Sequence, residues 1–158
     1  MNWQEVCEHP SLQNLPFKIE LNERGQVVMS PTKILHSVYQ GKLSNLLFLL
    51  LKGGEVLVEC AVETRKGTKV ADVAWASAAL FRRIKHQTAA SHAPEICIEV
   101  FSGSNTKAEM EEKKRLYFEQ GAQEVWFCNR VGAISFYNPE GKLPQSERCP
   151  EFPSKIKV

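Results

Sequence analysis

Hydrophobic positions recur along the chain at two spacings, and the longer spacing predicts helices. From Lys33 to Leu51 the apolar residues follow a helical period, with Thr32 as the expected N-cap and two glycines after the end. Lys107–Gln120 shows the same period, and either Asn105 or Thr106 is its expected N-cap. The chain is therefore predicted to contain two substantial helices.

Short apolar runs rich in β-branched and aromatic residues predict strands. They cover Phe17–Leu21, Gln26–Met29, Val56–Val62, Val70–Trp75, Glu95–Phe101, Glu124–Cys128 and Ala133–Tyr137. The first two flank a turn-rich segment and suggest a β-hairpin. Residues 78–92 fit either a short helix or an irregular basic loop, and the segment beyond Pro139 is expected to be a loop. This order predicts an α/β or α+β fold, a mixed sheet flanked by helices.

Composition limits the class of protein. A chain of 158 residues suits a single domain over residues 1–158, and its 43% hydrophobic content is too high for a disordered chain. The longest apolar stretch, Leu46–Leu51, is too short to cross a bilayer, so a cytoplasmic protein without a membrane partner is expected. A net charge of +2 is too small to indicate a nucleic-acid partner by itself.

The five cysteines show no metal-binding or redox spacing. No two of them form a C-x-x-C pair, which argues against a zinc site and a disulfide framework. They are expected to be buried, reduced thiols. The five are Cys7, Cys60, Cys97, Cys128 and Cys149.

Two acidic residues interrupt strands that otherwise look buried. Asp72 lies within Lys69–Trp75, and Glu99 lies near the end of Glu95–Phe101. A buried carboxylate needs a cation, a proton or an opening to solvent. For either acid alone, the simpler explanation is that it meets water at a strand end or pairs with an arginine such as Arg65. Two such acids on consecutive strands suggest a hard-oxygen site suited to Mg²⁺ or Mn²⁺.

The helix that follows Glu99 carries a third anomaly. Lys113 and Lys114 both project within an arc of apolar residues that includes Met110 and Leu116. Such a lysine either reaches back to solvent or assists a metal site by stabilising charge on a phosphoryl oxygen. Helical spacing does not choose between the two lysines.

Taken in order, several segments resemble the Uma-two endonuclease-like family, a branch of the PD-(D/E)XK restriction-endonuclease superfamily. The resemblance runs from about Phe17 to Phe136. Its strongest parts are Val70–Trp75, Pro94–Ser102, Lys113 with Tyr117 and Gly121, the Glu124–Trp126 strand, and the Met29–Thr32 turn followed by His36. It implies a restriction-endonuclease-like fold.

The resemblance also assigns roles. It implies that Asp72 and Glu99 are the metal-binding acids, with the backbone carbonyl of Val100 as a further metal ligand. It selects Lys113 as the catalytic lysine, because the family's lysine lies one helical turn before the tyrosine matched by Tyr117. Glu20, His36 and Tyr117 are secondary candidates near the same cleft.

The chain departs from the superfamily pattern at three positions. Ala71 replaces the motif's proline, Phe101 replaces the lysine of the E-x-K element, and Gly103 replaces a proline common in the family. None of these changes removes a metal ligand. Activity would therefore depend on Lys113 in place of the strand lysine.

The leading hypothesis is a Mg²⁺- or Mn²⁺-dependent endonuclease that hydrolyses DNA phosphodiester bonds. DNA is the expected partner, with backbone contacts from basic residues at 82, 83, 85, 114 and 115, although such charge runs are more often solvated surfaces. A homodimer is expected by analogy alone. The alternatives are a non-catalytic nucleic-acid or protein-binding module that retains the fold, and a hydrolase of small phosphate esters.

Overall fold

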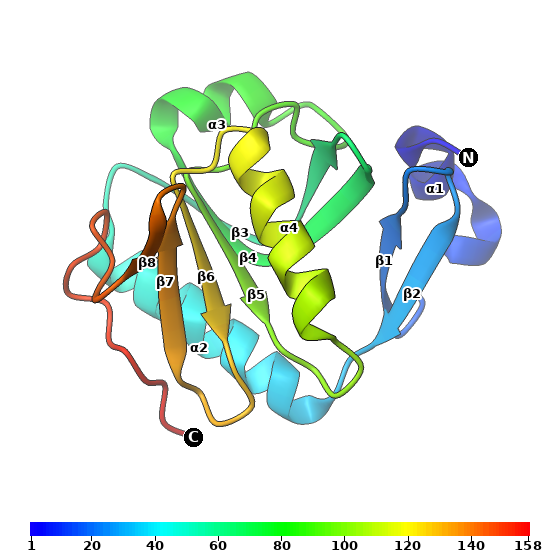
Figure 1. Ribbon diagram of the computed structural model, residues 1–158. Coiled ribbons are helices and arrows are strands. Elements are labelled where there is room, and N and C mark those ends of the chain that lie inside the picture. Colours follow the sequence, from blue (N-terminus) through cyan, green and yellow to red (C-terminus); the bar gives the residue numbers. More distant parts are fainter.

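A computed structural model describes residues 1–158 and contains two sheets and four α-helices (Figure 1). The helices are α1 (Trp3–Glu8), α2 (Ile34–Leu50), α3 (Ala78–Ile84) and α4 (Lys107–Glu119), and a short 3-10 turn spans Pro10–Leu12. The strands are β1 (Phe17–Leu21), β2 (Val27–Pro31), β3 (Gly54–Thr64), β4 (Gly67–Ser77), β5 (Ile96–Val100), β6 (Glu124–Cys128), β7 (Ile134–Asn138) and β8 (Gly141–Leu143).

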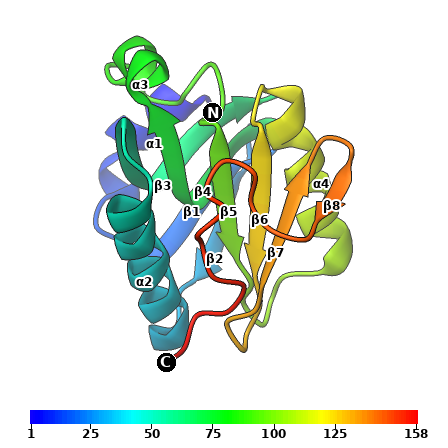
Figure 2. The ribbon, with the colours of Figure 1, turned by 90° about the vertical axis from the view of Figure 1, so that its left-hand side faces the viewer.

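The main sheet is a single six-stranded layer in the order β3-β4-β5-β6-β7-β8. Neighbouring strands in this sheet are antiparallel except for β5 and β6, which run parallel because α4 carries the chain back between them. Helices α2 and α4 lie on opposite faces of this sheet (Figures 1 and 2). The expected mixed sheet flanked by helices is confirmed.

The alternation of side chains along the central strands divides the core into two parts. On the α2 face, Leu43 and Leu47 pack with Val73, Ile98 and Trp126. The α4 face buries a second cluster that includes Cys97, Met110, Tyr117 and Val125. Strand β5 is buried on both sides, as its continuous apolar run predicts.

The hairpin of β1 and β2 forms a separate sheet that packs beside β4. The Glu20 carboxylate joins the two sheets, because its Oε2 accepts a hydrogen bond of 2.7 Å from the Val70 N–H. Gly67 allows the close approach: its φ is +88°, and a Cβ there would lie 2.3 Å from the Leu21 carbonyl oxygen. The hairpin therefore rests against the sheet beside Asp72.

Helix boundaries agree with the sequence except at their caps. Thr32 does not cap α2, because the N-cap is Lys33 and its side chain makes no capping hydrogen bond. In α4 the cap is Thr106, in a capping box with Glu109. Between residues 78 and 92 the chain forms the short helix α3 and then a loop.

Three further expectations need correction. Strands β3 and β4 are longer than predicted because they form one continuous hairpin through the turn at Arg65 and Lys66. Strand β8 was not expected at all. Cys7 is exposed and Cys60 half-buried, although all five cysteines are free thiols as predicted. None of the helices is long and apolar enough to cross a membrane.

Candidate functional site

The two strand acids lie where β4 and β5 separate. The ladder between these strands ends at Val73 and Ile98. One step further along the same register, Asp72 faces Glu99. Both side chains are almost fully buried, with 2% and 3% of their surface exposed. The acids expected to converge are therefore neighbours, beyond the last main-chain pair of the two strands.

Each oxygen of the Asp72 carboxylate has its own set of contacts. Oδ2 accepts a hydrogen bond of 2.7 Å from the Val100 N–H and lies 3.4 Å from His36 Nε2. Oδ1 lies 3.0 Å from the ammonium of Lys18. The Asp72 side chain therefore accepts a hydrogen bond from a β5 N–H through Oδ2, which leaves Oδ1 directed towards Glu99.

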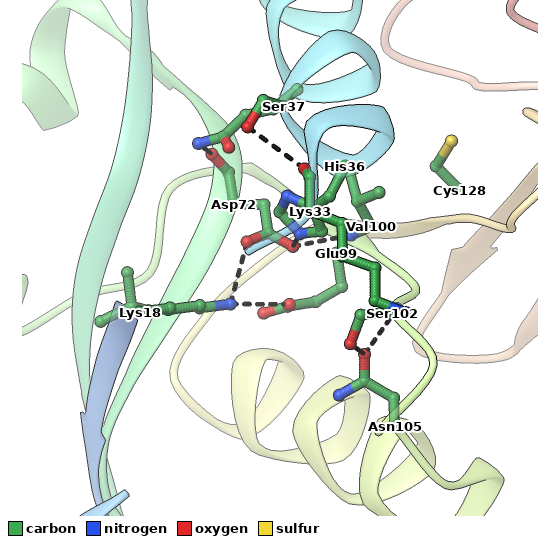
Figure 3. Close-up of polar contacts among 12 residues, drawn as sticks. Lys18, Lys33, His36, Ser37, Asp72, Glu99, Val100, Ser102, Asn105 and Cys128 are labelled. Atoms are coloured by element: carbon green, nitrogen blue, oxygen red, sulfur yellow. Dashed lines mark hydrogen bonds and ion pairs between the residues drawn. The ribbon is translucent and has the colours of Figure 1, made fainter. Parts of the chain in front are cut away.

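The Glu99 carboxylate is divided in the same way. Its Oε1 accepts a hydrogen bond of 2.7 Å from the Tyr117 hydroxyl and lies 3.2 Å from Lys113 Nζ. Its Oε2 lies 3.1 Å from Lys18 Nζ. Helix α4 thus holds one oxygen of Glu99, while the other shares a cation with Asp72 (Figure 3).

The structure distinguishes the two lysines that helical spacing left unresolved. Lys113 points into the cluster, where its ammonium lies 2.7 Å from Glu20 Oε2 and 3.2 Å from Glu99 Oε1. Lys114 instead pairs with Glu111 and lies over the ring of Tyr137, 4.0 Å from its centre. Of the two lysines, only Lys113 reaches Glu20 and Glu99.

Lys18 is the one member of the cluster that the sequence did not indicate. It stands two residues before Glu20 on β1, so both side chains share a face of that strand. Its ammonium bridges Asp72 and Glu99 (Figure 3), and its side chain is 9% exposed. The only hint in the sequence was that Lys18 and Glu20 lie two residues apart and so share one face of a strand. That spacing does not reveal which other element the two side chains contact.

His36 approaches the cluster from the first turns of α2. The side chain is buried, and its Nδ1 has no hydrogen-bond partner. Gln40, one helical turn later, donates a hydrogen bond of 3.0 Å to the Asp72 carbonyl oxygen. Helix α2 therefore holds the Asp72 main chain and places an imidazole beside its carboxylate.

Burial and charge act against each other in this cluster. Burial is the largest single effect on Asp72 and works to raise its pKa, but the Lys18 ammonium, His36 and the Val100 N–H together outweigh it and hold that pKa well below its usual range. For Glu99 burial prevails, and its pKa is raised despite the ammoniums of Lys113 and Lys18. The pKa of Glu20 is lowered, because Lys113 and Lys18 outweigh the effect of burial.

These groups line a cavity of about 400 Å³ that also borders the β2 segment and the start of α4. The loop before α4 is held by Asn105, whose Oδ1 accepts hydrogen bonds from the N–H and the hydroxyl of Ser102 (Figure 3). None of the five basic residues expected to contact DNA, at 82, 83, 85, 114 and 115, lines this cavity.

The donor set fits a hard divalent cation held mainly by water. No three His, Cys, Asp or Glu side chains gather closely enough to hold an ion by themselves. Mg²⁺, however, commonly uses only one or two carboxylates and keeps several waters. Asp72 Oδ1 and Glu99 Oε2 already converge on one ammonium, which shows that their positions suit a shared cation.

Comparison with known proteins finds a matching family and a solved structure with a similar fold. Residues 3–157 match the model of the Uma2 family, described as "Putative restriction endonuclease". The chain also resembles a solved structure described as "a putative nuclease belonging to DUF820" from Anabaena variabilis, with a TM-score of 0.77, 14% identity, and coverage of 99% of this chain and 94% of that one. At that identity the likeness concerns the fold. No curated protein matches.

Proposed function

Because the chain belongs to the Uma2 family, we propose that it is a metal-dependent endonuclease that hydrolyses DNA phosphodiester bonds. One observation carries the proposal: Asp72 Oδ1 and Glu99 Oε2 converge on a single cation position inside a cavity that Lys113 also lines. This arrangement suits a site for Mg²⁺ or Mn²⁺, because Mg²⁺ is commonly bound through one or two carboxylates and keeps several waters.

The proposed ligands are the two acids and the backbone carbonyl of Val100. When bound, the metal would lower the pKa of a water ligand and neutralise charge on the phosphate. The Val100 N–H supports Asp72 as a ligand, because it holds the second oxygen of that carboxylate and leaves Oδ1 directed at the shared position. Tyr117 does the same for Glu99 by binding Oε1.

Lys113 is the proposed catalytic cation. Its side chain is 13% exposed and its ammonium contacts Glu20 and Glu99, so it is held in place yet lines the cavity. There it would steady the attacking water or the charge that develops on a phosphoryl oxygen. Glu20 acts as a positioning residue, since its carboxylate holds both the Lys113 ammonium and the Val70 N–H.

A nuclease assay with a matched lysine pair tests the proposal. The purified chain is incubated with plasmid and oligonucleotide DNA in Mg²⁺, Mn²⁺ or EDTA, together with Asp72→Ala, Lys113→Ala and Lys114→Ala. Loss of one charge-stabilising group commonly costs about 10²–10³-fold in rate. We expect such losses for Asp72→Ala and Lys113→Ala only, because Lys114 lies outside the cavity. Equal cleavage by all four proteins, or cleavage in EDTA, would overturn it.

The alternative is a nucleic-acid or protein-binding module that keeps the fold without the chemistry. One observation favours it: Asp72 and Glu99 already share an ammonium, so the cluster does not need a metal to be charge-paired. It predicts DNA or partner binding that ignores divalent metal and survives Glu99→Ala. Fluorescence anisotropy with labelled DNA in EDTA and in Mn²⁺ separates the two functions.

A further inference from the structure

The contacts of Lys18 differ in kind from those of Lys113. Lys113 binds Glu99 through Oε1, which Tyr117 also holds. Lys18 binds Oε2 of Glu99 and Oδ1 of Asp72, the two oxygens that face each other across the gap between the strands. Its ammonium therefore stands in the place where a cation shared by both acids would bind (Figure 3).

We propose that the Lys18 ammonium is a built-in competitor of the divalent cation: it occupies the position between Asp72 and Glu99 and must be displaced before metal binds. The inference rests on the proposed function, because it concerns the same two acids. It assigns to Lys18 an effect on metal affinity that neither the family match nor the fold supplies.

Distances require the displacement. The Lys18 ammonium lies 3.0 Å from Asp72 and 3.1 Å from Glu99, whereas Mg²⁺ binds oxygen at about 2.0–2.1 Å in a near-octahedral shell. A metal that bound the same two oxygens from the side where the ammonium lies would overlap the ammonium's volume. The two cations therefore exclude each other sterically as well as by charge.

The chain allows the ammonium to leave. Lys18 reaches the acids through a flexible four-carbon stem, and it comes from a hairpin that is not part of the six-stranded sheet. The cavity beside it provides space for a new rotamer. The contact between Glu20 and Val70 holds the hairpin independently of Lys18, so the side chain can move while the strand stays.

Charge balance is consistent with this exchange. With Lys18 in place, three carboxylates (Glu20, Asp72 and Glu99) meet two ammoniums, which leaves one negative charge in excess when all are ionised. If a divalent cation replaces Lys18 beside Lys113, the same three carboxylates are fully neutralised. The cluster can thus accept either cation without acquiring excess positive charge.

Calorimetric titration with Mn²⁺ tests the competition without using activity. The full chain is compared with Lys18→Met, Lys18→Arg and Lys69→Met. Lys69 is the matched control, because it lines the same cavity but binds the Leu21 carbonyl oxygen and neither acid. Two charge-assisted contacts no longer have to be broken in Lys18→Met, so we expect Mn²⁺ to bind it at least about tenfold more tightly. Lys69→Met should stay within about twofold of the unmodified chain, and Lys18→Arg should bind Mn²⁺ equally or less tightly.

Thermal melting shows whether Lys18→Met still folds. Without metal, Lys18→Met leaves two buried carboxylates short of a cation, so it should melt at a lower temperature and gain more from Mn²⁺ than the unmodified chain does. If Lys18→Met does not fold, the arginine variant decides, because tighter Mn²⁺ binding by Lys18→Arg overturns the inference.

The outcomes separate this inference from the proposed function. Equal Mn²⁺ affinity for the unmodified chain and Lys18→Met, with DNA cleavage still dependent on metal, overturns the competition alone. If neither protein binds Mn²⁺ at millimolar concentrations, both proposals fall. A tenfold gain confined to Lys18→Met supports the competition whether or not the chain cleaves DNA.

Discussion

Removing a single hydroxyl from Tyr117 tests whether α4 holds Glu99 in place. The hydroxyl is fully buried and donates a hydrogen bond of 2.7 Å to Glu99 Oε1. Tyr117→Phe keeps the ring and its packing against Met110 and Val125, and deletes only this donor. The remaining contact to Oε1 is then the Lys113 ammonium at 3.2 Å.

The expected cost follows from the nature of the bond. A hydrogen bond to a charged group contributes about 1.5–3 kcal/mol, so the variant should lose about 2 kcal/mol in free energy of unfolding. For a chain of this size that corresponds to a fall in Tm of about 4–8 °C. The pKa of Glu99, already raised by burial, should rise further without this donor.

Urea denaturation at neutral pH, with Tyr137→Phe as control, measures the difference. No hydrogen bond involves the Tyr137 hydroxyl, and a phenylalanine ring would still face Lys114. The control should therefore stay within about 0.5 kcal/mol of the unmodified chain. If both variants are equally stable, the bond between Tyr117 and Glu99 contributes nothing and the proposed positioning of Glu99 by Tyr117 is wrong.

Three further measurements probe other buried groups. Glu124→Ala should cost about 3 kcal/mol or more in urea denaturation without changing Mn²⁺ affinity, because its buried carboxylate accepts four hydrogen bonds far from the cavity. The pKa of Asp72 lies below its usual range, so its ionised form contributes stability that is fully present above about pH 4 and is lost as the pH falls through the folded-state pKa. Between about pH 5 and pH 2, Asp72→Asn should therefore lose less stability than the unmodified chain, as measured by acid titration followed by circular dichroism. Burial raises the pKa of Cys60 and of Cys128 to about 12, so iodoacetamide at pH 8 should label the exposed Cys7 first, as read by peptide mass spectrometry; early labelling of Cys128 would contradict its burial.

The proximity of Asp72 and Glu99 could be predicted from the sequence, because both acids interrupt buried runs on consecutive strands. In an antiparallel pair the positions that face one another follow from where the ladder lies, and here it ends one residue before the acids. Periodicity could not choose between Lys113 and Lys114, since both fall within the apolar arc of α4. That choice depends on where the helix axis lies over the sheet, which is a property of tertiary packing.

Lys18 was missed for a different reason. A lysine in a short strand is ordinarily a solvated residue, and the Glu20 that shares its strand face does not reveal which other element Lys18 meets. Its role arises because the β1–β2 hairpin rests against β4, a contact between segments more than fifty residues apart. The same holds for β8, which forms by pairing with β7 although its own three residues carry no strand pattern.

The buried acids of the sheet show why a carboxylate in an apolar strand is not enough to identify a site. Glu95 directly precedes β5, and its oxygens accept hydrogen bonds from the Ser77 N–H. Glu124 begins β6 and accepts from two main-chain N–H groups, the Trp126 indole and the Ser146 hydroxyl, none of which is a cation. Such donors are fixed and cannot be exchanged for an ion, so these acids stabilise loops and a helix start. Asp72 and Glu99 each keep one oxygen on an ammonium at the end of a flexible side chain. Because an ammonium can be replaced by another cation while a peptide N–H cannot move away, the kind of donor that a buried acid accepts from is what separates the candidate metal site from structural burial.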